Sequence, residues 1–402
     1  MALKGNAVIG QSGGPTVVIN QSVVGAVLES KNHGVIDHFY GALHGVRGIL
    51  DQNFVDLSAE SPDNLERIAK TPSAALGSVR MKPTEEDCRE IFRVLRAHDV
   101  RFFFYVGGND SAETAHIVHT VAEADSYDLR VFHIPKTIDN DLLVNDHCPG
   151  YGSAAKFVAM ACMGDGLDNR AIPGVKIDVI MGRHAGFLTA AAALGRRDES
   201  DAPHLVYLPE VPFSEDKFVS DVENVLSRHP NCLVAVSEGI ADKDGKPVLQ
   251  SKEVDSHGNV QLSGTGALGD FLADIVKSRL KLSRVRADTF GYLQRSFPGL
   301  YSEVDAREAR EVGAHAVRAA ATEEAQNGAI AIRRLASGAD YASDTFITPL
   351  STVAKHTKSF DAEFINSDGN HVTDAFRDYA LPLLGELPEI GRIEAPKITP
   401  IG

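Results

Sequence analysis

The sequence predicts an α/β fold divided into two domains. Short apolar runs alternate with segments of helical spacing along most of the chain, which is the rhythm of buried parallel strands covered by helices. The length of 402 residues exceeds what one compact core usually contains, so two domains of ordinary size are expected. In folds of this class, functional groups gather at the carboxyl ends of the strands.

The individual elements follow from local patterns. Six runs are expected to be buried strands: NAVIG, FFFYVGG, LRVFHIPK, KIDVIMG, HLVYLPE and NCLVAVSEG. The clearest amphipathic helices cover 219–229 and 305–328, and the second is expected to end on Asn327 and Gly328 as its C-cap. Turn signals at both ends of 242–260 predict a surface hairpin.

Composition and charge exclude several classes of protein. A chain that is 43% hydrophobic and 24% charged, with no apolar run near the ~20 residues of a membrane span, is expected to be cytoplasmic and to have no membrane partner. The formal charge of -15 argues against nucleic acid as a partner, since phosphate backbones require clustered Lys and Arg. Four widely spaced cysteines without a CxxC pair predict free thiols.

Three of the expected strands end in turns that contain glycine. These turns are GQSGGPT (10–16), VGGNDS (106–111) and MGRHAG (181–186). Glycine lets backbone N–H groups approach an anion, and the positive N-terminal end of a following helix adds to the attraction. One such turn is weak evidence, because a strand-to-helix turn often needs glycine for its geometry alone, but three together favour a phosphate-bearing ligand.

Isolated basic residues stand beside these turns or at other strand ends. They are Arg80, Lys136, Arg183, Arg286 and Arg295. An arginine fork can bind a phosphate through two charge-assisted hydrogen bonds, each worth ~1.5–3 kcal/mol. Each of them could instead be an ordinary solvated surface charge. Their position in loops at strand ends favours a binding role over this alternative.

The stretch PKTIDND, residues 135–141, is the most unusual of the loops. It places Lys136, Asp139 and Asp141 within six residues. This polar spacing fits neither a buried strand nor an amphipathic helix. We therefore interpret it as a functional loop at the end of a strand.

With GGNDS, PKTIDND, MGRHAGFL, SEG and GYLQR in this order, the chain resembles the phosphofructokinase family, and in particular its pyrophosphate-dependent branch. The resemblance implies two Rossmann-like layered α/β domains with the active site in the cleft between them. Residues 1–148 and 296–340 would bind the phosphoryl donor, and 149–295 and 341–402 the sugar phosphate. The implied reaction is the transfer of a phosphoryl group from pyrophosphate to the 1-hydroxyl of fructose 6-phosphate in glycolysis, with Mg²⁺.

The resemblance also implies roles for single residues. Asp139 would accept the proton of the sugar hydroxyl, and Asp141 would steady Asp139 or help to hold the metal. Arg183 would stabilise the transferring group, whose loose transition state depends mainly on positioning and charge neutralisation. The other implied residues are Thr137, Met181, Gly182, Glu238, Arg286, Tyr292 and Arg295 for the sugar phosphate, and Gly13, Gly14, Arg80, Gly108, Asp110, Ser111 and Lys136 for the donor.

Two of these positions bear on the choice of donor. Relatives that use ATP carry glycine where this chain has Asp110 and again where it has Lys136. A carboxylate ~4 Å from the α-phosphate of ATP costs ~4 kcal/mol at an effective dielectric near 20, which is close to a thousandfold in affinity. Lys136 would supply the positive charge that holds pyrophosphate without an adenosine anchor.

Two departures from the family pattern concern the metal and the assembly. Asn109 stands where pyrophosphate enzymes commonly carry Asp, so Mg²⁺ would be held by Asp139 together with the amide oxygen of Asn109, or without it. The arginine that family members often donate across a subunit boundary before MGR is missing, and Lys176 lies nearby in another register. Arg286 would reach a neighbouring subunit, which implies a homodimer or homotetramer.

Three alternatives compete with this assignment. An ATP-dependent phosphofructokinase is opposed by Asp110 and Lys136. A non-catalytic regulatory subunit of the same fold would have lost the base or the transferring arginine, and this chain keeps Asp139 and Arg183. A lipid or nicotinamide-nucleotide kinase shares only a GGDG-like turn, and the TIDND and GYLQR stretches disfavour it.

Overall fold

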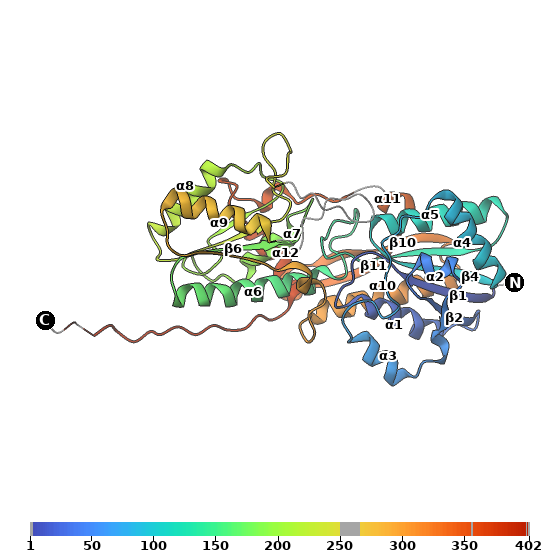
Figure 1. Ribbon diagram of the computed structural model, residues 1–402. Coiled ribbons are helices and arrows are strands. Elements are labelled where there is room, and N and C mark those ends of the chain that lie inside the picture. Colours follow the sequence, from blue (N-terminus) through green and yellow to red (C-terminus); the bar gives the residue numbers. More distant parts are fainter. Residues whose placement is uncertain (1–2, 250–265, 355–356, 399, 401–402) are drawn as a thin grey trace.

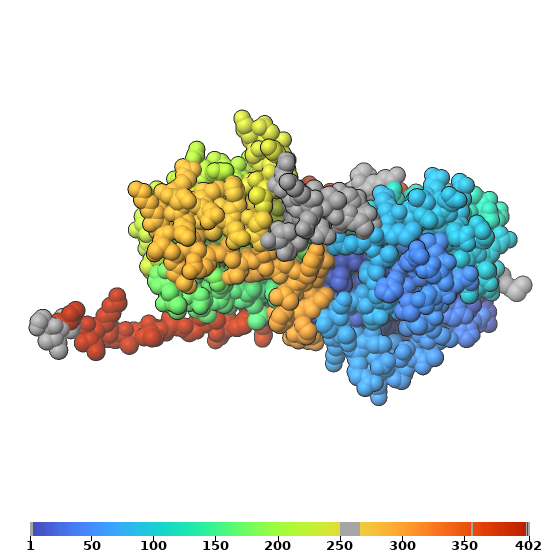
Figure 2. All heavy atoms as spheres, viewed as in Figure 1, coloured from blue at the N-terminus to red at the C-terminus, as the bar shows by residue number. Residues whose placement is uncertain are grey.

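The computed structural model describes residues 3–249, 266–354, 357–398 and 400. The chain forms two α/β lobes, each with its own sheet, and the stretch after the last helix extends away from one of them (Figure 1). The space-filling view shows the same two lobes side by side (Figure 2). The predicted α/β class is confirmed. Within the described ranges, no helix combines the length and the apolar character needed to cross a bilayer.

The larger lobe contains a seven-stranded sheet in the order β11-β10-β5-β4-β1-β2-β3. Its strands are β1 (Gly5–Gln11), β2 (Ile36–Ala42), β3 (Phe54–Asp56), β4 (Val100–Gly107), β5 (Arg130–Pro135), β10 (Asn327–Ala336) and β11 (Ala342–Thr348). The five strands from β10 to β2 pair in parallel, whereas β3 and β11 close the two edges in antiparallel pairs. Apolar side chains point to both faces of β4, as a strand covered on both sides by helices requires.

The smaller lobe contains a four-stranded parallel sheet in the order β7-β8-β6-β9. Its strands are β6 (Val175–Ile180), β7 (Leu205–Tyr207), β8 (Cys232–Ser237) and β9 (Val285–Thr289). All six apolar runs predicted as strands are therefore strands, three in each sheet. Parallel strands send their carboxyl ends to one edge of a sheet, so the Gly-bearing turns after β1 and β4 share one edge of the large sheet.

Helices cover both faces of each sheet. Their bounds are α1 (Ile19–Ser30), α2 (Val46–Leu50), α3 (Pro62–Ala69), α4 (Glu85–Ala97), α5 (Asn109–Ala124), α6 (Tyr151–Ala171), α7 (Phe187–Ala190), α8 (Glu215–Leu226), α9 (Ala267–Leu280), α10 (Glu303–Ala321), α11 (Leu350–Val353) and α12 (Asp374–Leu384). One core lies between the large sheet and α1 with α10, and another between that sheet and α4 with α5. In the smaller lobe, α6 and α12 pack on one face and α8 and α9 on the other.

Two sequence-based boundaries differ from the structure. Residues 341–402 were expected in the sugar-phosphate domain, yet β11 pairs with β10 in the large sheet, because the short turn between them reverses the chain beside its own predecessor. The helix expected at 305–328 ends at Ala321, where the Thr322 N–H and hydroxyl both donate to Arg318 O, and Asn327 begins β10 instead of capping the helix. Only the start of the expected hairpin at 242–260 is described; residues 250–260 lie outside the described residues.

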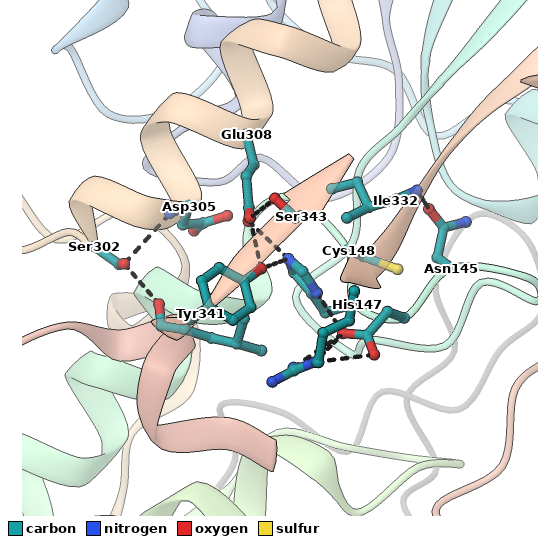
Figure 3. Close-up of polar contacts among 12 residues, drawn as sticks. Asn145, His147, Cys148, Ser302, Asp305, Glu308, Ile332, Tyr341 and Ser343 are labelled. Atoms are coloured by element: carbon teal, nitrogen blue, oxygen red, sulfur yellow. Dashed lines mark hydrogen bonds and ion pairs between the residues drawn. The ribbon is translucent and has the colours of Figure 1, made fainter. Parts of the chain in front are cut away.

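A buried polar network joins the segment after β5 to α10 (Figure 3). His147 Nε2 lies 2.7 Å from Glu308 Oε2, and its Nδ1 lies 2.7 Å from Asp146 Oδ2. Tyr341 and Ser343 each donate a hydroxyl hydrogen bond of 2.6 Å to Glu308 Oε1. Burial lowers the pKa of His147, but the hydrogen bonds to the two carboxylates outweigh burial and raise it, so the ring is a cation between two anions.

The same helix α10 also holds the beginning of α6. The Asp305 carboxylate accepts hydrogen bonds from Gly150 N at 2.8 Å, from Ser153 N at 2.9 Å and from the Ser153 hydroxyl at 2.5 Å. The two N–H groups belong to the N-cap and the first turn of α6. Backbone N–H groups at the start of a helix have no acceptor within the helical hydrogen-bond pattern. Burial raises the pKa of Asp305 to about 6. Helix α10 thus fixes the chain on both sides of Cys148 and Pro149.

The network makes a prediction about stability. Glu308→Ala leaves the buried His147 and two hydroxyls without their acceptor, so we expect the free energy of unfolding to fall by ~3–5 kcal/mol, measured by urea denaturation. Glu311→Ala is the matched control on the same helix. The Glu308 side chain is 6% exposed and the Glu311 side chain 49%, so the control should change by less than ~1 kcal/mol. Equal effects of the two changes would contradict a structural role for the network.

Candidate active site

The candidate site is built on the loop that follows β5. The Lys136 N–H donates to Gly107 O at 3.0 Å, which continues the pairing of β5 with β4 past the last strand residue. The Thr137 hydroxyl accepts a hydrogen bond from Asp139 N at 3.1 Å. The predicted loop therefore begins as an extension of the sheet and then turns on its own side chains.

Asn140 determines how the two aspartates of the loop are presented. Its backbone has a φ of 60°, the left-handed region that Asn tolerates better than most residues, and its side chain is fully buried. Its Oδ1 accepts from Cys148 N at 3.0 Å, and its Nδ2 donates to the Tyr379 hydroxyl at 2.8 Å. The Tyr379 hydroxyl in turn donates to Asp146 O at 2.7 Å. Asn140 is thus held inside the protein, whereas its neighbours Asp139 and Asp141 are both partly exposed.

The electrostatics of the loop favour a carboxyl group that can exchange a proton near neutral pH. Burial and then the neighbouring Asp141 raise the pKa of Asp139 to about 7, while Arg295 opposes the shift. Burial also raises the pKa of Asp141, and a hydrogen bond from Thr137 works in the opposite direction. Glu238, from the smaller lobe, is among the charges that act on Asp139. Such a perturbed pair is typical of functional sites.

Lys136 points into the protein toward the first glycine turn. Its Nζ donates to Gly14 O at 2.8 Å, and the side chain is 4% exposed. Burial, followed by the positive charge of Arg295, lowers the pKa of Lys136 to about 8. Arg80 contributes to the same positive potential at Lys136 and at Arg295. Three cationic side chains from three distant stretches of sequence thus act on one another around one turn.

The glycines of that turn make room for the cations. Gly13 has a φ of 76°, and a Cβ added there would lie 3.2 Å from Lys136 Nζ. A Cβ added at Gly14 would lie 3.2 Å from Arg295 Cζ. Any side chain at these two positions would press against the ammonium and the guanidinium. The need for both glycines is therefore steric as well as conformational.

The turns after β6 and β8 lie against each other at the edge of the small sheet. Gly182 O accepts a hydrogen bond of 2.7 Å from the Ser237 hydroxyl, and Glu238 N donates to Ile180 O at 2.9 Å. A Cβ at Gly239 would collide with Arg183 O, which explains the glycine that follows Glu238. Met181 is buried and Arg183 is half-buried beside them. The two predicted sugar-binding turns are therefore one contiguous surface.

The turn after β4 leads directly into helix α5. Gly108 is the N-cap of α5, and the Ser111 side chain is buried under the turn, where a Cβ on Gly107 would collide with it. Asn109 Oδ1 is buried, and in the described part of the chain it has no hydrogen-bond donor. A buried oxygen without a donor is a ready ligand for a hard cation. Together with the carboxylates of Asp139 and Asp141, this oxygen fits the donor set that Mg²⁺ prefers.

Asp110 lies at the rim of the site. Its side chain is 77% exposed, and one carboxylate oxygen lies 3.7 Å from Lys82 Nζ. Lys82 pairs more closely with Glu113, at 2.9 Å. Asp110 and Lys136 were expected to face the donor pocket as a pair, and the structure distinguishes them, since Lys136 is buried and Asp110 faces solvent.

Of the predicted sugar-phosphate residues, Arg286 lies apart. It is on the outer strand β9 with an exposed side chain, and its guanidinium donates to Val285 O at 2.9 Å. Its register partner on β6 is Lys176, which forms ion pairs with Asp165 and, at 3.2 Å, with Asp288. Arg295, expected beside Arg286, instead lies against the Gly13–Gly14 turn.

Tyr292 stays close to Arg295. The Arg295 guanidinium lies 4.7 Å from the centre of the Tyr292 ring, and the ring is 49% exposed. Such a cation–π contact orients the arginine without neutralising it. Arg295 can therefore bind a phosphate group from a fixed position.

Sequence reasoning missed Asn140 and Tyr379 as site-forming residues. Asn140 lies inside the motif that was singled out, and its place between two aspartates was the available signal. Tyr379 lies on α12, 239 residues further along, in a stretch where the sequence indicated no site residue. No local pattern around Tyr379 predicts this contact, because it depends on how α12 packs against α6 and the loop.

Comparison with known proteins agrees with this arrangement. A family model described as phosphofructokinase matches residues 6–320, well over half of the chain. The chain belongs to the phosphofructokinase family. A pyrophosphate–fructose 6-phosphate 1-phosphotransferase of Rhodospirillum rubrum is 53% identical over 403 residues, which cover 99% of each chain. An enzyme of the same name from Xanthomonas campestris pv. campestris is 40% identical and covers 96% of this chain and 93% of its own.

Solved structures of family members show the same architecture. The pyrophosphate-dependent phosphofructokinase of Marinobacter aquaeolei superimposes with a TM-score of 0.86 at 32% identity, covering 97% of this chain and 94% of its own. This likeness supports the expected two-domain α/β fold.

The aspartate pair gives a prediction that needs no turnover. Because the negative charge of Asp141 raises the pKa of Asp139, Asp141→Asn should lower the pKa of Asp139 from about 7 toward the ordinary range of Asp. Carbon-13 NMR of the labelled Asp carboxyl groups would measure it. Asp110→Asn, an exposed site on α5, is the control and should leave that pKa unchanged. An unchanged pKa in Asp141→Asn would contradict the coupling.

Proposed function

We propose that this protein catalyses the reversible phosphorylation of fructose 6-phosphate to fructose 1,6-bisphosphate with pyrophosphate as donor, as a cytoplasmic enzyme of glycolysis. The observation that carries the proposal is the gathering of Lys136, Arg295 and Arg80 around the Gly13–Gly14 turn beside Asp139. These residues offer phosphate-binding charge next to a proton acceptor. The names of the full-length relatives support the same reaction.

Asp139 acts as the base in this proposal. In the forward direction it takes the proton of the sugar 1-hydroxyl as the oxygen attacks the terminal phosphorus of pyrophosphate, and in the reverse direction it returns that proton. Burial and then the charge of Asp141 keep the pKa of Asp139 high, so that the group can both accept and release a proton near neutral pH. Arg183, at the end of β6, stabilises the charge on the transferring phosphoryl group.

The sugar phosphate lies along the edge of the small sheet. Met181, Gly182 and Glu238 hold the sugar, with Thr137 at the loop and Tyr292 beside them. Arg295, at the Gly13–Gly14 turn, binds a phosphate group of the donor. Arg286 is too exposed on the outer strand β9 to serve the site of its own chain, which supports its donation to a neighbouring subunit. We propose a homodimer or homotetramer on this ground.

Mg²⁺ completes the donor site in this proposal. Asn109 Oδ1 and the carboxylates of Asp139 and Asp141 would hold the ion, and the buried oxygen of Asn109 supports this choice of ligands. When bound, the ion neutralises charge on the phosphate oxygens of pyrophosphate. Gly108 and Ser111 position the N-terminal end of α5, whose N–H groups favour an anion.

The choice of donor depends more on Lys136 than on Asp110. An exposed carboxylate ~4 Å from a phosphate interacts with it through water, which reduces the repulsion from the ~4 kcal/mol expected in an enclosed site to ~1 kcal/mol, or about fivefold in affinity. Lys136 is buried, so its charge is screened far less. The buried ammonium therefore contributes most of the preference for pyrophosphate, and Asp110 adds a smaller penalty against a nucleotide.

The role of Asp139 as the base predicts how its substitution changes kcat and how kcat/KM depends on pH. Asp139→Ala should lower kcat by at least ~10²-fold in both directions and leave the melting temperature nearly unchanged. In the unmodified protein the forward kcat/KM should fall below pH about 7, where Asp139 gains a proton, and above pH about 8, where Lys136 loses its proton. Lys136→Arg should remove the alkaline limb alone. A flat profile across this range would contradict these assignments.

The donor assignment predicts a graded set of variants. Lys136→Gly should weaken the use of pyrophosphate by ~10²-fold or more, since it removes a buried charge–charge contact. Asp110→Gly should improve the use of ATP by about fivefold and scarcely change pyrophosphate. Steady-state assays with each donor at saturating fructose 6-phosphate measure both. Equal turnover of the unmodified protein with ATP and with pyrophosphate would refute the proposed donor.

A further inference from the structure

The C-terminal part of the chain runs beside the loop that carries Asp139 and Asp141. Thr357 forms an antiparallel bridge with Leu142. The next residue, Lys358, donates a hydrogen bond of 2.7 Å from its backbone N–H to Asp141 O. Two backbone contacts at successive residues fix how the two segments lie against each other. The Lys358 side chain therefore starts from a position that the loop itself determines.

The Lys358 ammonium is a hydrogen-bond donor to the main chain of this loop. Its Nζ donates to Asn145 O at 3.2 Å and also to Asp146 O. Burial is the largest influence on the pKa of Lys358 and lowers it, so the surroundings disfavour the charged form. The hydrogen bonds to the two carbonyl oxygens compensate for part of this cost. The ammonium thus satisfies carbonyl groups that would otherwise need water or another donor.

Tyr379 connects this ammonium to the Asn140 anchor. The Tyr379 hydroxyl donates to Asp146 O, the same oxygen that accepts from Lys358, and it accepts from Asn140 Nδ2. Lys358 Nζ also lies 5.6 Å from the centre of the Tyr379 ring. Two side chains of the C-terminal stretch therefore converge on one carbonyl oxygen of the loop. One of the two also holds the neutral residue between the aspartates.

The same ammonium contacts the helix that follows the Arg183 turn. Lys358 Nζ lies 4.9 Å from the centre of the Phe187 ring, which is fully buried at the start of α7. The ring centres of Phe187 and Tyr379 are 6.1 Å apart, and α7 and α12 lie beside each other where the lobes meet (Figure 1). Lys358 therefore touches a loop of the larger lobe and a helix of the smaller lobe.

We propose that Lys358 and Tyr379 are positioning residues that hold the Asp139 loop against the Arg183 turn. The inference rests on the proposed function, in which Asp139 is the base and Arg183 stabilises the transferring group. Both side chains are already engaged by protein groups, so they act through these two residues and not on a substrate. A misplacement of ~1 Å between reacting groups can lower a rate by ~10²-fold, which is why such a support affects turnover.

The test compares Lys358→Met and Tyr379→Phe with a matched control. Methionine keeps an unbranched apolar chain and removes the ammonium, and phenylalanine keeps the ring and removes the hydroxyl. The control is Tyr127→Phe, because the Tyr127 hydroxyl also donates to a main-chain oxygen, Val100 O at 3.0 Å. Val100 begins β4, at the opposite end of that strand from the candidate site. Urea denaturation of each variant measures the general loss of stability.

The first readout needs no turnover. A loosened loop admits water, so the pKa of Asp139 should fall from about 7 to about 6 or below in Lys358→Met and Tyr379→Phe. Carbon-13 NMR of labelled Asp carboxyl groups measures it. Removal of a positive charge alone would raise the pKa of a carboxyl group, so the direction of the shift separates positioning from a direct charge effect. The charges that act on Asp139 remain in every variant: Asp141, Arg295, Glu238 and Lys136.

The second readout is the division of the effect between kcat and KM. In both test variants kcat should fall by about tenfold or more, with the KM of each substrate changed by less than about threefold. Tyr127→Phe should change neither kcat nor the pKa of Asp139. If Lys358→Met fails to fold, Tyr379→Phe decides the outcome, since it removes a single oxygen atom.

Three results would overturn the proposal. The first is an unchanged or raised pKa of Asp139 in the folded test variants. The second is a KM for a phosphate substrate that rises tenfold or more while kcat is preserved, which would make Lys358 a ligand. The third is an equal change of kcat and pKa in Tyr127→Phe, which would reduce the effect to general stability. If the unmodified protein does not turn over the proposed substrates, the proposed function fails, and the NMR comparison still tests this inference.

Discussion

The two hydrogen bonds of the Asn140 side chain are the constraint on which the candidate site depends. They hold one residue of the loop inward, in a left-handed backbone conformation, between Cys148 N and the Tyr379 hydroxyl. Asp139 and Asp141, on either side of Asn140, are thereby held near each other although their negative charges repel. Burial and then this repulsion raise the pKa of Asp139, so the anchoring of a neutral residue contributes to the chemistry of a charged one.

The anchor is itself held by the buried network that follows it. Asp146, whose carbonyl accepts from Tyr379, also bears the carboxylate that pairs with His147 and Arg334. His147 continues the chain of contacts to Glu308 on α10. Paired and hydrogen-bonded charges of this kind specify one arrangement, since any other leaves a buried charge alone. The loop, α10 and α12 therefore form one rigid support under the aspartates.

The cationic part of the site is also built from like charges held close together. Lys136, Arg295 and Arg80 repel one another, and burial lowers the pKa of the first two. Their proximity is tolerated because Gly13 and Gly14 leave space and Gly14 O accepts from the ammonium. Such a group of cations is stabilised by an anionic ligand, which is why it is suited to binding phosphate and costs stability without it.

The sequence alone determined the fold class, the six buried strands and the stretches that meet at the candidate site, because apolar periodicity and glycine turns are local properties. It did not determine that α10 ends at Ala321, that β11 joins the large sheet, or that Asp110 faces solvent while Lys136 is buried. It also did not determine the contacts of Tyr379 with Asn140 and of Arg295 with Gly14. These two contacts join residues far apart in the chain, and only the tertiary packing brings such residues together.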